Sequence, residues 1–277
     1  MPTALLVPDV LDVPDVLADL TLDERVRAHR LLDVLPAGSA FARRTAAALH
    51  GFDVAAHTER DVPRRLEVVV PCGRTPVRRE GGRCYAAEPG DDVVEVDGLP
   101  VTSVLRTAVD VARFCPRFVA LPVLDVAARA GLLSPVQALV RLDDLPGGRG
   151  VRIARHTAGM VDPGAESPPE SLVRIRLDDA GFPRPQTQIP VPGARGGLLR
   201  LDLGWQERRV AVEYDGREFH DGWREQRHDG ARREHLQRLG WVVLPVTSGD
   251  VLGRVPRLEQ AVGEVLGREP RLRTRRW

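Results

Sequence analysis

The sequence contains Leu198-Leu-Arg-Leu-Asp-Leu-Gly-Trp205 and, after four intervening residues, Val210-Ala-Val-Glu-Tyr-Asp215. Apolar and polar residues alternate in both runs, and a period of two is the pattern of a half-buried β-strand. The residues Gln206 to Arg209 can form a tight turn, so we expect the two runs to pair as a β-hairpin. A four-residue turn sets the register and places Asp202 opposite Glu213.

A third acidic residue belongs to the same patch. Asp215 lies two residues after Glu213, so both side chains point to one face of the strand. Directly opposed residues on neighbouring strands have Cβ atoms about 5 Å apart, so Asp202, Glu213 and Asp215 share a small area, while leucines and valines fill the other face. Like charges in such positions destabilise a sheet, and without a cation at least one of these carboxyl groups should take up a proton.

A divalent cation would remove this conflict. Carboxylate oxygens suit Mg²⁺ or Mn²⁺, and such a metal can lower the pKa of a bound water and stabilise charge on a phosphoryl oxygen, which is the chemistry of phosphodiester hydrolysis. The run Glu213-Tyr-Asp-Gly216, followed by His220, favours a metal site, because acids, a glycine turn and a histidine at the end of a strand contribute little to packing. The alternative is a solvated strand face whose charges are balanced by Arg200, Arg208 and Arg209.

The hairpin lies inside a longer series of predicted elements. Hydrophobic periodicity and helix start and stop signals predict the order α-β-β-β-α-β-α. The expected elements are a helix at 167–180, strands at 187–191, 198–205 and 210–215, a helix at 222–239, a strand at 241–246 and a helix from about 250 with Val251, Val255, Leu258, Val262 and Val265 on one face.

A proline- and glycine-rich segment, Asp162-Pro-Gly-Ala-Glu-Ser-Pro-Pro169, precedes this series. Such a composition is typical of a domain boundary, so we expect one domain at 1–160 and another at 165–277. The first domain is predicted to be mixed, with helices at 22–35 and 40–49, strands within 66–104, and helices at 103–114, 117–131 and 134–143. The predicted fold class is therefore α/β (α+β).

Composition narrows the range of functions. The chain of 277 residues has no apolar run long enough to cross a membrane and no basic start before an apolar stretch, so we expect neither a membrane partner nor a secretory signal. Cys72, Cys84 and Cys115 are an odd number without metal-ligand spacing, and we expect reduced thiols and a cytoplasmic location. The net charge of +1 gives no global sign of nucleic-acid binding, and all 40 cationic residues are arginines because the chain has no lysine.

The C-terminal part resembles the restriction-endonuclease-like, or PD-(D/E)XK, superfamily, in its branch similar to very-short-patch-repair endonucleases. The resemblance is carried by Arg200-Leu-Asp-Leu-Gly-Trp205, Arg209-Val-Ala-Val-Glu-Tyr-Asp-Gly216 and His220, and by the segments 229–236 and 240–244. It implies an αβββαβ core and hydrolysis of DNA phosphodiester bonds with Mg²⁺ or Mn²⁺.

Residue roles follow from that resemblance. Asp202 would be the central metal ligand and Glu213 the second. The lysine usual in the superfamily would fall at Asp215, which could instead be a third ligand. His220 would act as general base or hold a metal-bound water.

Two further residues have competing interpretations. Glu170 corresponds to the acidic residue on the first helix of such cores, but Ser167-Pro-Pro-Glu170 is also a capping-box pattern. Arg232 could contact the scissile phosphate, or it could form an ion pair with Asp229 or Glu225.

The first 160 residues resemble proteins with an abortive-infection type IV antitoxin-like region. The resemblance is carried by Arg44-Thr-Ala-Ala-Ala-Leu-His-Gly51, Asp97-Gly-Leu-Pro-Val-Thr-Ser103 and Arg106-Thr-Ala-Val-Asp110. We therefore expect a metal-dependent endonuclease with DNA as partner, in a defence or toxin–antitoxin context that could add a protein partner. The alternative is a catalytically inactive, antitoxin-like regulator that keeps the nuclease fold and binds DNA or protein.

Overall fold

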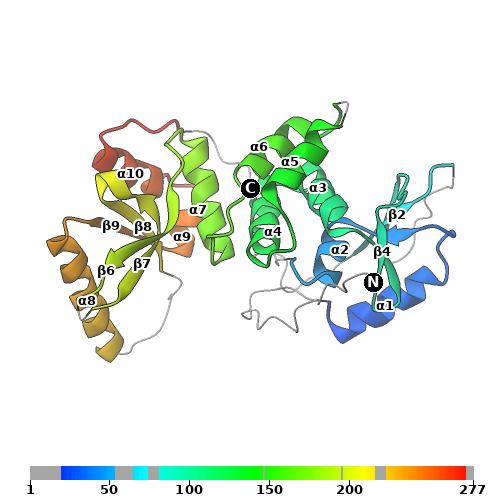
Figure 1. The fold of residues 1–277 in the computed structure, drawn as a ribbon, viewed down its shortest axis with the longest axis horizontal. Coiled ribbons are helices and arrows are strands. Elements are labelled where there is room, and N and C mark those ends of the chain that lie inside the picture. Colours follow the sequence, from blue (N-terminus) through cyan, green and yellow to red (C-terminus); the bar gives the residue numbers. More distant parts are fainter. Residues whose placement is uncertain are drawn as a thin grey trace, which may run out of the picture. The chain divides into compact units, whose positions relative to one another are not determined.

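The structure is a computed structural model that describes residues 20–53, 65–73, 81–145, 147–194, 196–215 and 223–272, with only the backbone at 223–229 (Figure 1). The chain divides into two compact units, Met1–Thr107 and Ala108–Trp277, which are treated separately below. Both contain a sheet with helices, which confirms the α/β (α+β) class. The expected domain boundary between 160 and 165 falls inside the second unit and stays a prediction.

The first unit is built around a five-stranded sheet with the order β3-β2-β1-β5-β4. Its elements are α1 (Leu22–Leu32), β1 (Ala40–Phe41), α2 (Arg43–Leu49), β2 (Leu66–Val70), β3 (Gly82–Ala86), β4 (Val93–Val96) and β5 (Leu99–Thr102). The predicted turn at Asp97-Gly98 joins β4 to β5, and both residues have positive φ, as a two-residue hairpin turn requires. The helix predicted at 40–49 begins only at Arg43, because Ala40 and Phe41 pair with β2.

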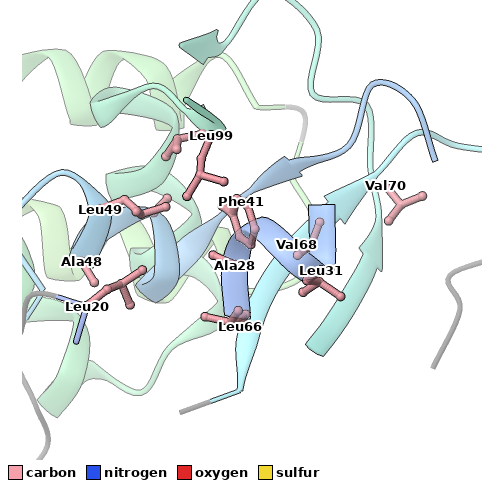
Figure 2. Close-up of a cluster of buried hydrophobic side chains, with 12 residues drawn as sticks. Leu20, Ala28, Leu31, Phe41, Ala48, Leu49, Leu66, Val68, Val70 and Leu99 are labelled. Atoms are coloured by element: carbon pink, nitrogen blue, oxygen red, sulfur yellow. The ribbon is translucent and has the colours of Figure 1, made fainter. Parts of the chain in front are cut away.

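The core of this unit lies between its helices and one face of the sheet (Figure 2). Ala28 and Leu31 of α1 and Leu49 of α2 pack there against strand residues such as Phe41 and Val68, all of which are buried. The apolar side chains of α1 and α2 therefore cover the strands, as expected for helices that carry an apolar stripe.

Helices make up the beginning of the second unit. They are α3 (Val104–Phe114, whose first residues belong to the first unit), α4 (Arg117–Arg129), α5 (Pro135–Asp143), α6 (Val151–Gly159) and α7 (Pro168–Asp179). Ser134 caps α5 ahead of Pro135, as predicted. Helix α6 was not predicted; Gly150, with φ 80°, lies at its N-cap.

A buried ion pair joins α4 to α7. Asp125 accepts a hydrogen bond from Arg174 at 2.8 Å and another from Ser171 at 2.6 Å, and it also accepts one from the backbone N–H of Asp162 at 2.8 Å. Arg174 donates in addition to the carbonyl of Met160. The side chains of Asp125 and Arg174 are 1% and 2% exposed, so the pair is sealed from water and holds α7 against α4.

The second sheet has four strands in the order β6-β7-β8-β9. Its strands are β6 (Gln186–Pro192), β7 (Leu198–Trp205), β8 (Val210–Tyr214) and β9 (Val242–Val246), and its further helices are α8 (Trp223–Arg238), α9 (Ser248–Leu252) and α10 (Arg257–Leu266). Strand β9 runs parallel to β8, and the other neighbours are antiparallel. From α7 to β9 the elements follow the predicted αβββαβ order.

Two predictions for this sheet were wrong in detail. The final helix is broken into α9 and α10 by residues 253–256, so Val255 is 57% exposed instead of sharing the buried face with Val251. Leu201 and Leu203 do not share one face: Leu203 packs with the cluster that includes residues of α7 and α10, and Leu201 packs with Leu236 of α8 and with Trp241. The regular alternation is interrupted at the position where Gln188 of β6 has a positive φ of 51°.

Candidate functional site

The hairpin of β7 and β8 forms as the sequence predicts. Trp205 pairs with Val210 and Leu203 pairs with Val212, so residues 206–209 make the turn and Asp202 comes level with Glu213. Strand pairing ends at Leu203 and Val212. Beyond that point the side chain of Asp202 takes the place of a backbone partner, because its Oδ2 accepts a hydrogen bond of 2.9 Å from the backbone N–H of Tyr214. Asp202 and Glu213, two of the three predicted metal ligands, therefore lie where the strands separate.

Arg232 of α8 binds Glu213 with both arms of its guanidinium group. Nη1 donates to one carboxylate oxygen and Nη2 to the other, each at 2.7 Å, and Nη2 also donates to the carbonyl of Arg200 at 3.0 Å. A fork-shaped pair of this kind is the strongest ordinary contact of a carboxylate. Glu213 was not among the ion-pair partners expected for Arg232; the side chains of those partners, Asp229 and Glu225, lie outside the described residues, so that expectation stays a prediction.

Glu170 approaches the same site from the first turn of α7. It is buried, and its carboxylate accepts hydrogen bonds from the hydroxyl of Ser167 at 2.8 Å and from the backbone N–H of Glu166 at 2.9 Å. The predicted capping box is not formed, because the Ser167 side chain caps no N–H of the helix and the N–H that Glu170 binds belongs to the residue before the N-cap. Glu170 is therefore bound to the segment that precedes α7, and the charge of Asp202 also acts on it; its role as a site residue stays a prediction.

Burial dominates the electrostatics of the site. Burial raises the pKa of Glu170 to about 7, and the negative charges of Asp202 and Glu166 add to the increase, against the two hydrogen bonds that lower it. Burial also raises the pKa of Asp202; the Tyr214 N–H and Arg232 oppose this rise, and the charges of Glu213 and Glu166 add to it. The site thus collects carboxyl groups from α7, β7 and β8 in positions where each disfavours the ionisation of another.

The described residues do not fit a metal ion as they are arranged. Within the described part of the chain, no group of three or more His, Cys, Asp or Glu side chains could hold a metal, and both oxygens of Glu213 are bound to Arg232. His220 lies outside the described residues. Asp215 is half-buried, and its N–H donates to the carbonyl of Val246 at 2.8 Å, which ends the pairing of β8 with β9. The Mg²⁺ or Mn²⁺ site stays a prediction.

The network that holds α7 in place could not be predicted from spacing. Asp125 reaches Ser171 and Arg174 across 46 and 49 residues of chain, and on α7 itself Arg176 forms a second buried pair with Glu259 of α10. These contacts fix the helix that carries Glu170. The sequence did contain one sign of this network: Asp125 lies inside the largely apolar helix α4, and a charged residue is seldom buried in such a helix without a partner.

Comparison with known proteins agrees with one of the two resemblances. Residues 38–158 match the family described as AbiEi antitoxin C-terminal domain, which confirms the antitoxin-like region. No solved structure matches the chain, and the resemblance to PD-(D/E)XK nucleases stays a prediction. None of the described helices is long and apolar enough to cross a membrane.

Two relatives come from strains of Mycobacterium tuberculosis, the uncharacterized proteins MT2308 and Rv2248. Each is 36% identical to the chain over 228 residues, which is 82% of this chain and 81% of the relative. The chain therefore belongs to the same family as these mycobacterial proteins, and its residues 38–158 form an antitoxin-like region of the AbiEi type.

Proposed function

We propose that this protein is an antitoxin-like regulator that acts by binding DNA or a partner protein, with a C-terminal nuclease-type fold that does not cut DNA. The observation that carries the proposal is the match of residues 38–158 to the AbiEi antitoxin C-terminal domain. The ion pair between Glu213 and Arg232 agrees with it, because an arginine already neutralises the charge of this acid and occupies one lone pair on each of its oxygens. The absence of lysine points the same way, since the superfamily's usual lysine has no substitute in this chain.

The test compares cutting with binding. Supercoiled and linear DNA would be incubated with the protein and Mg²⁺ or Mn²⁺, with EDTA as control, beside the variants Asp202→Ala and Glu207→Ala. Glu207 is an exposed acid in the turn of the same hairpin and serves as the matched control. The expected result is intact DNA in every lane. Metal-dependent nicking that disappears in Asp202→Ala but persists in Glu207→Ala would refute the proposal.

A second assay decides whether the protein binds DNA. Fluorescence anisotropy with labelled duplex DNA in EDTA would detect a DNA-binding regulator, and its affinity should fall as salt increases, because phosphate contacts release counterions. A protein that neither cuts nor binds DNA would act on a protein partner.

Metal-dependent DNA hydrolysis is the second candidate function. The specific observation in its favour is the raised pKa of both Glu170 and Asp202, which are neighbouring carboxyl groups in need of a cation. In this interpretation Asp202, Glu213 and Asp215 would hold Mg²⁺ or Mn²⁺, and His220 would handle the proton. The nicking assay separates the two candidates.

A further inference from the structure

Arg232 interacts with Glu213 and Asp202, two of the three residues that the nuclease resemblance assigns to the metal. It binds the two oxygens of Glu213 at 2.7 Å, and its positive charge lowers the pKa of Asp202 against the effect of burial. A third contact, from Nη2 to the carbonyl of Arg200, anchors the same guanidinium to β7. The guanidinium thus bridges β7 and β8 at the point where their pairing ends.

We propose that Arg232 is the resident cation of this acidic hairpin, and that it excludes a divalent metal by occupying Glu213. The inference concerns the control of the same site and rests on the proposed function, in which the hairpin does not cut DNA. The side chains of Glu213 and Arg232 are 18% and 35% exposed. A partly desolvated carboxylate needs a compensating charge, and the planar fork of arginine supplies charge and geometry together. A metal ion at Glu213 would have to displace this guanidinium or bind close to its positive charge.

The proposal makes a direct prediction for metal binding by the full-length protein. Titration with Mn²⁺ in a calorimeter at pH 8 should give an affinity at least about tenfold higher for Arg232→Gln than for the unsubstituted protein, because removal of one partner leaves the other charge uncompensated. Arg233→Gln is the matched control: it removes the same charge from an exposed neighbour on α8 and should leave Mn²⁺ affinity unchanged.

Two further variants keep the test decisive. Arg232→Lys keeps the positive charge but loses the planar fork of arginine, so its Mn²⁺ affinity should lie between those of the unsubstituted protein and Arg232→Gln. If Arg232→Gln folds poorly, Arg232→Lys should still bind Mn²⁺ more tightly than the unsubstituted protein. The double variant Arg232→Gln with Glu213→Gln should lose the increase in Mn²⁺ affinity that Arg232→Gln alone produces. Equal Mn²⁺ affinity with and without Arg232, including no binding by either, would overturn the proposal, and so would a gain that survives Glu213→Gln. These results are independent of DNA cutting by the unsubstituted protein, which tests the proposed function.

Discussion

Two buried carboxyl groups of the second unit, Glu170 and Asp125, show how far burial can outweigh a polar partner. Asp125 faces Arg174, Ser171 and a backbone N–H, and burial still raises its pKa to about 6. Glu170 has two hydrogen-bond donors but, among the residues that the structure describes, no cation in contact, and its pKa reaches about 7. The sequence predicts that Glu170 matters, through its place at the start of a helix, but its protonation depends on burial and on Asp202, which lies 32 residues away in the chain.

The raised pKa of Glu170 makes stability depend on pH in a definite direction. Because the pKa of the folded state, about 7, lies above the ordinary value of 4.5, the contribution of Glu170 to stability is fully present below pH 4.5 and is lost as pH rises through 7. Glu170→Gln cannot ionise and mimics the protonated form. We expect the free energy of unfolding of Glu170→Gln, relative to the unsubstituted protein, to increase from pH 5 to pH 8 by about 3 kcal/mol at most.

Urea unfolding in EDTA at the two pH values measures this difference. Glu207→Gln, at an exposed acid of the hairpin turn, is the control and should show the same relative stability at both. A relative stability of Glu170→Gln that does not change with pH would contradict the raised pKa.

At the scale of elements, the hairpin was the most predictable part of the site and its surroundings were the least. Alternation and turn length were enough to predict the register of Leu203 with Val212, because both are local properties of the chain. The exchange of faces between Leu201 and Leu203 was not predictable, since it coincides with an unusual backbone conformation at Gln188 on another strand. The contact of Arg232 with Glu213 was missed for a similar reason: the partners weighed from the sequence, Asp229 and Glu225, are near neighbours of Arg232 in the chain, whereas Glu213 lies on strand β8, 19 residues before it.

Gly204 allows the strands of the hairpin to approach each other closely. A Cβ atom at this position would lie 2.2 Å from the carbonyl oxygen of Val210 and 2.8 Å from Cα of Ala211, so the backbone would have to move. We expect Gly204→Ala to lower the free energy of unfolding by about 2 kcal/mol, the usual cost of overpacking. It should also disturb the hydrogen bond from Tyr214 to Asp202 at the end of the same ladder.

Gly230→Ala is the control for Gly204→Ala in urea unfolding. Gly230 lies within α8, and a Cβ atom there would meet nothing within 4 Å. This substitution should be neutral or stabilise the protein by up to about 1 kcal/mol, because alanine favours a helix over glycine. If Gly204→Ala were as stable as Gly230→Ala, close approach of the strands would not be the role of Gly204.

At the scale of the whole molecule, the composition of the sequence and the packing of the structure indicate different boundaries between the two parts of the chain. The run Asp162 to Pro169 has the composition of a linker, which predicted a domain that begins at 165. In the structure the same run lies within the second unit, between α6 and α7, and the backbone N–H of Asp162 is bound by Asp125. A linker-like composition reflects the local preferences of the backbone, whereas a domain boundary depends on which surfaces the fold buries. The ion pair of Asp125 with Arg174 is buried between residues that are far apart in the chain, so the composition of the segment between them does not predict it.

Two fragments distinguish these boundaries. A fragment of residues 116–277 keeps α4 with α7, whereas a fragment of residues 165–277 leaves Arg174 without Asp125 and uncovers the face of α7 that α4 buries. We expect the shorter fragment to unfold at lower urea concentration and to bind more of a hydrophobic dye such as ANS, because it exposes apolar surface and loses a buried ion pair. Asp125→Ala in the longer fragment should move its unfolding midpoint toward that of the shorter one. Equal midpoints for the two fragments would instead support an independent nuclease-like domain that begins at residue 165, and would make α4 an attachment to that domain without a part in its stability.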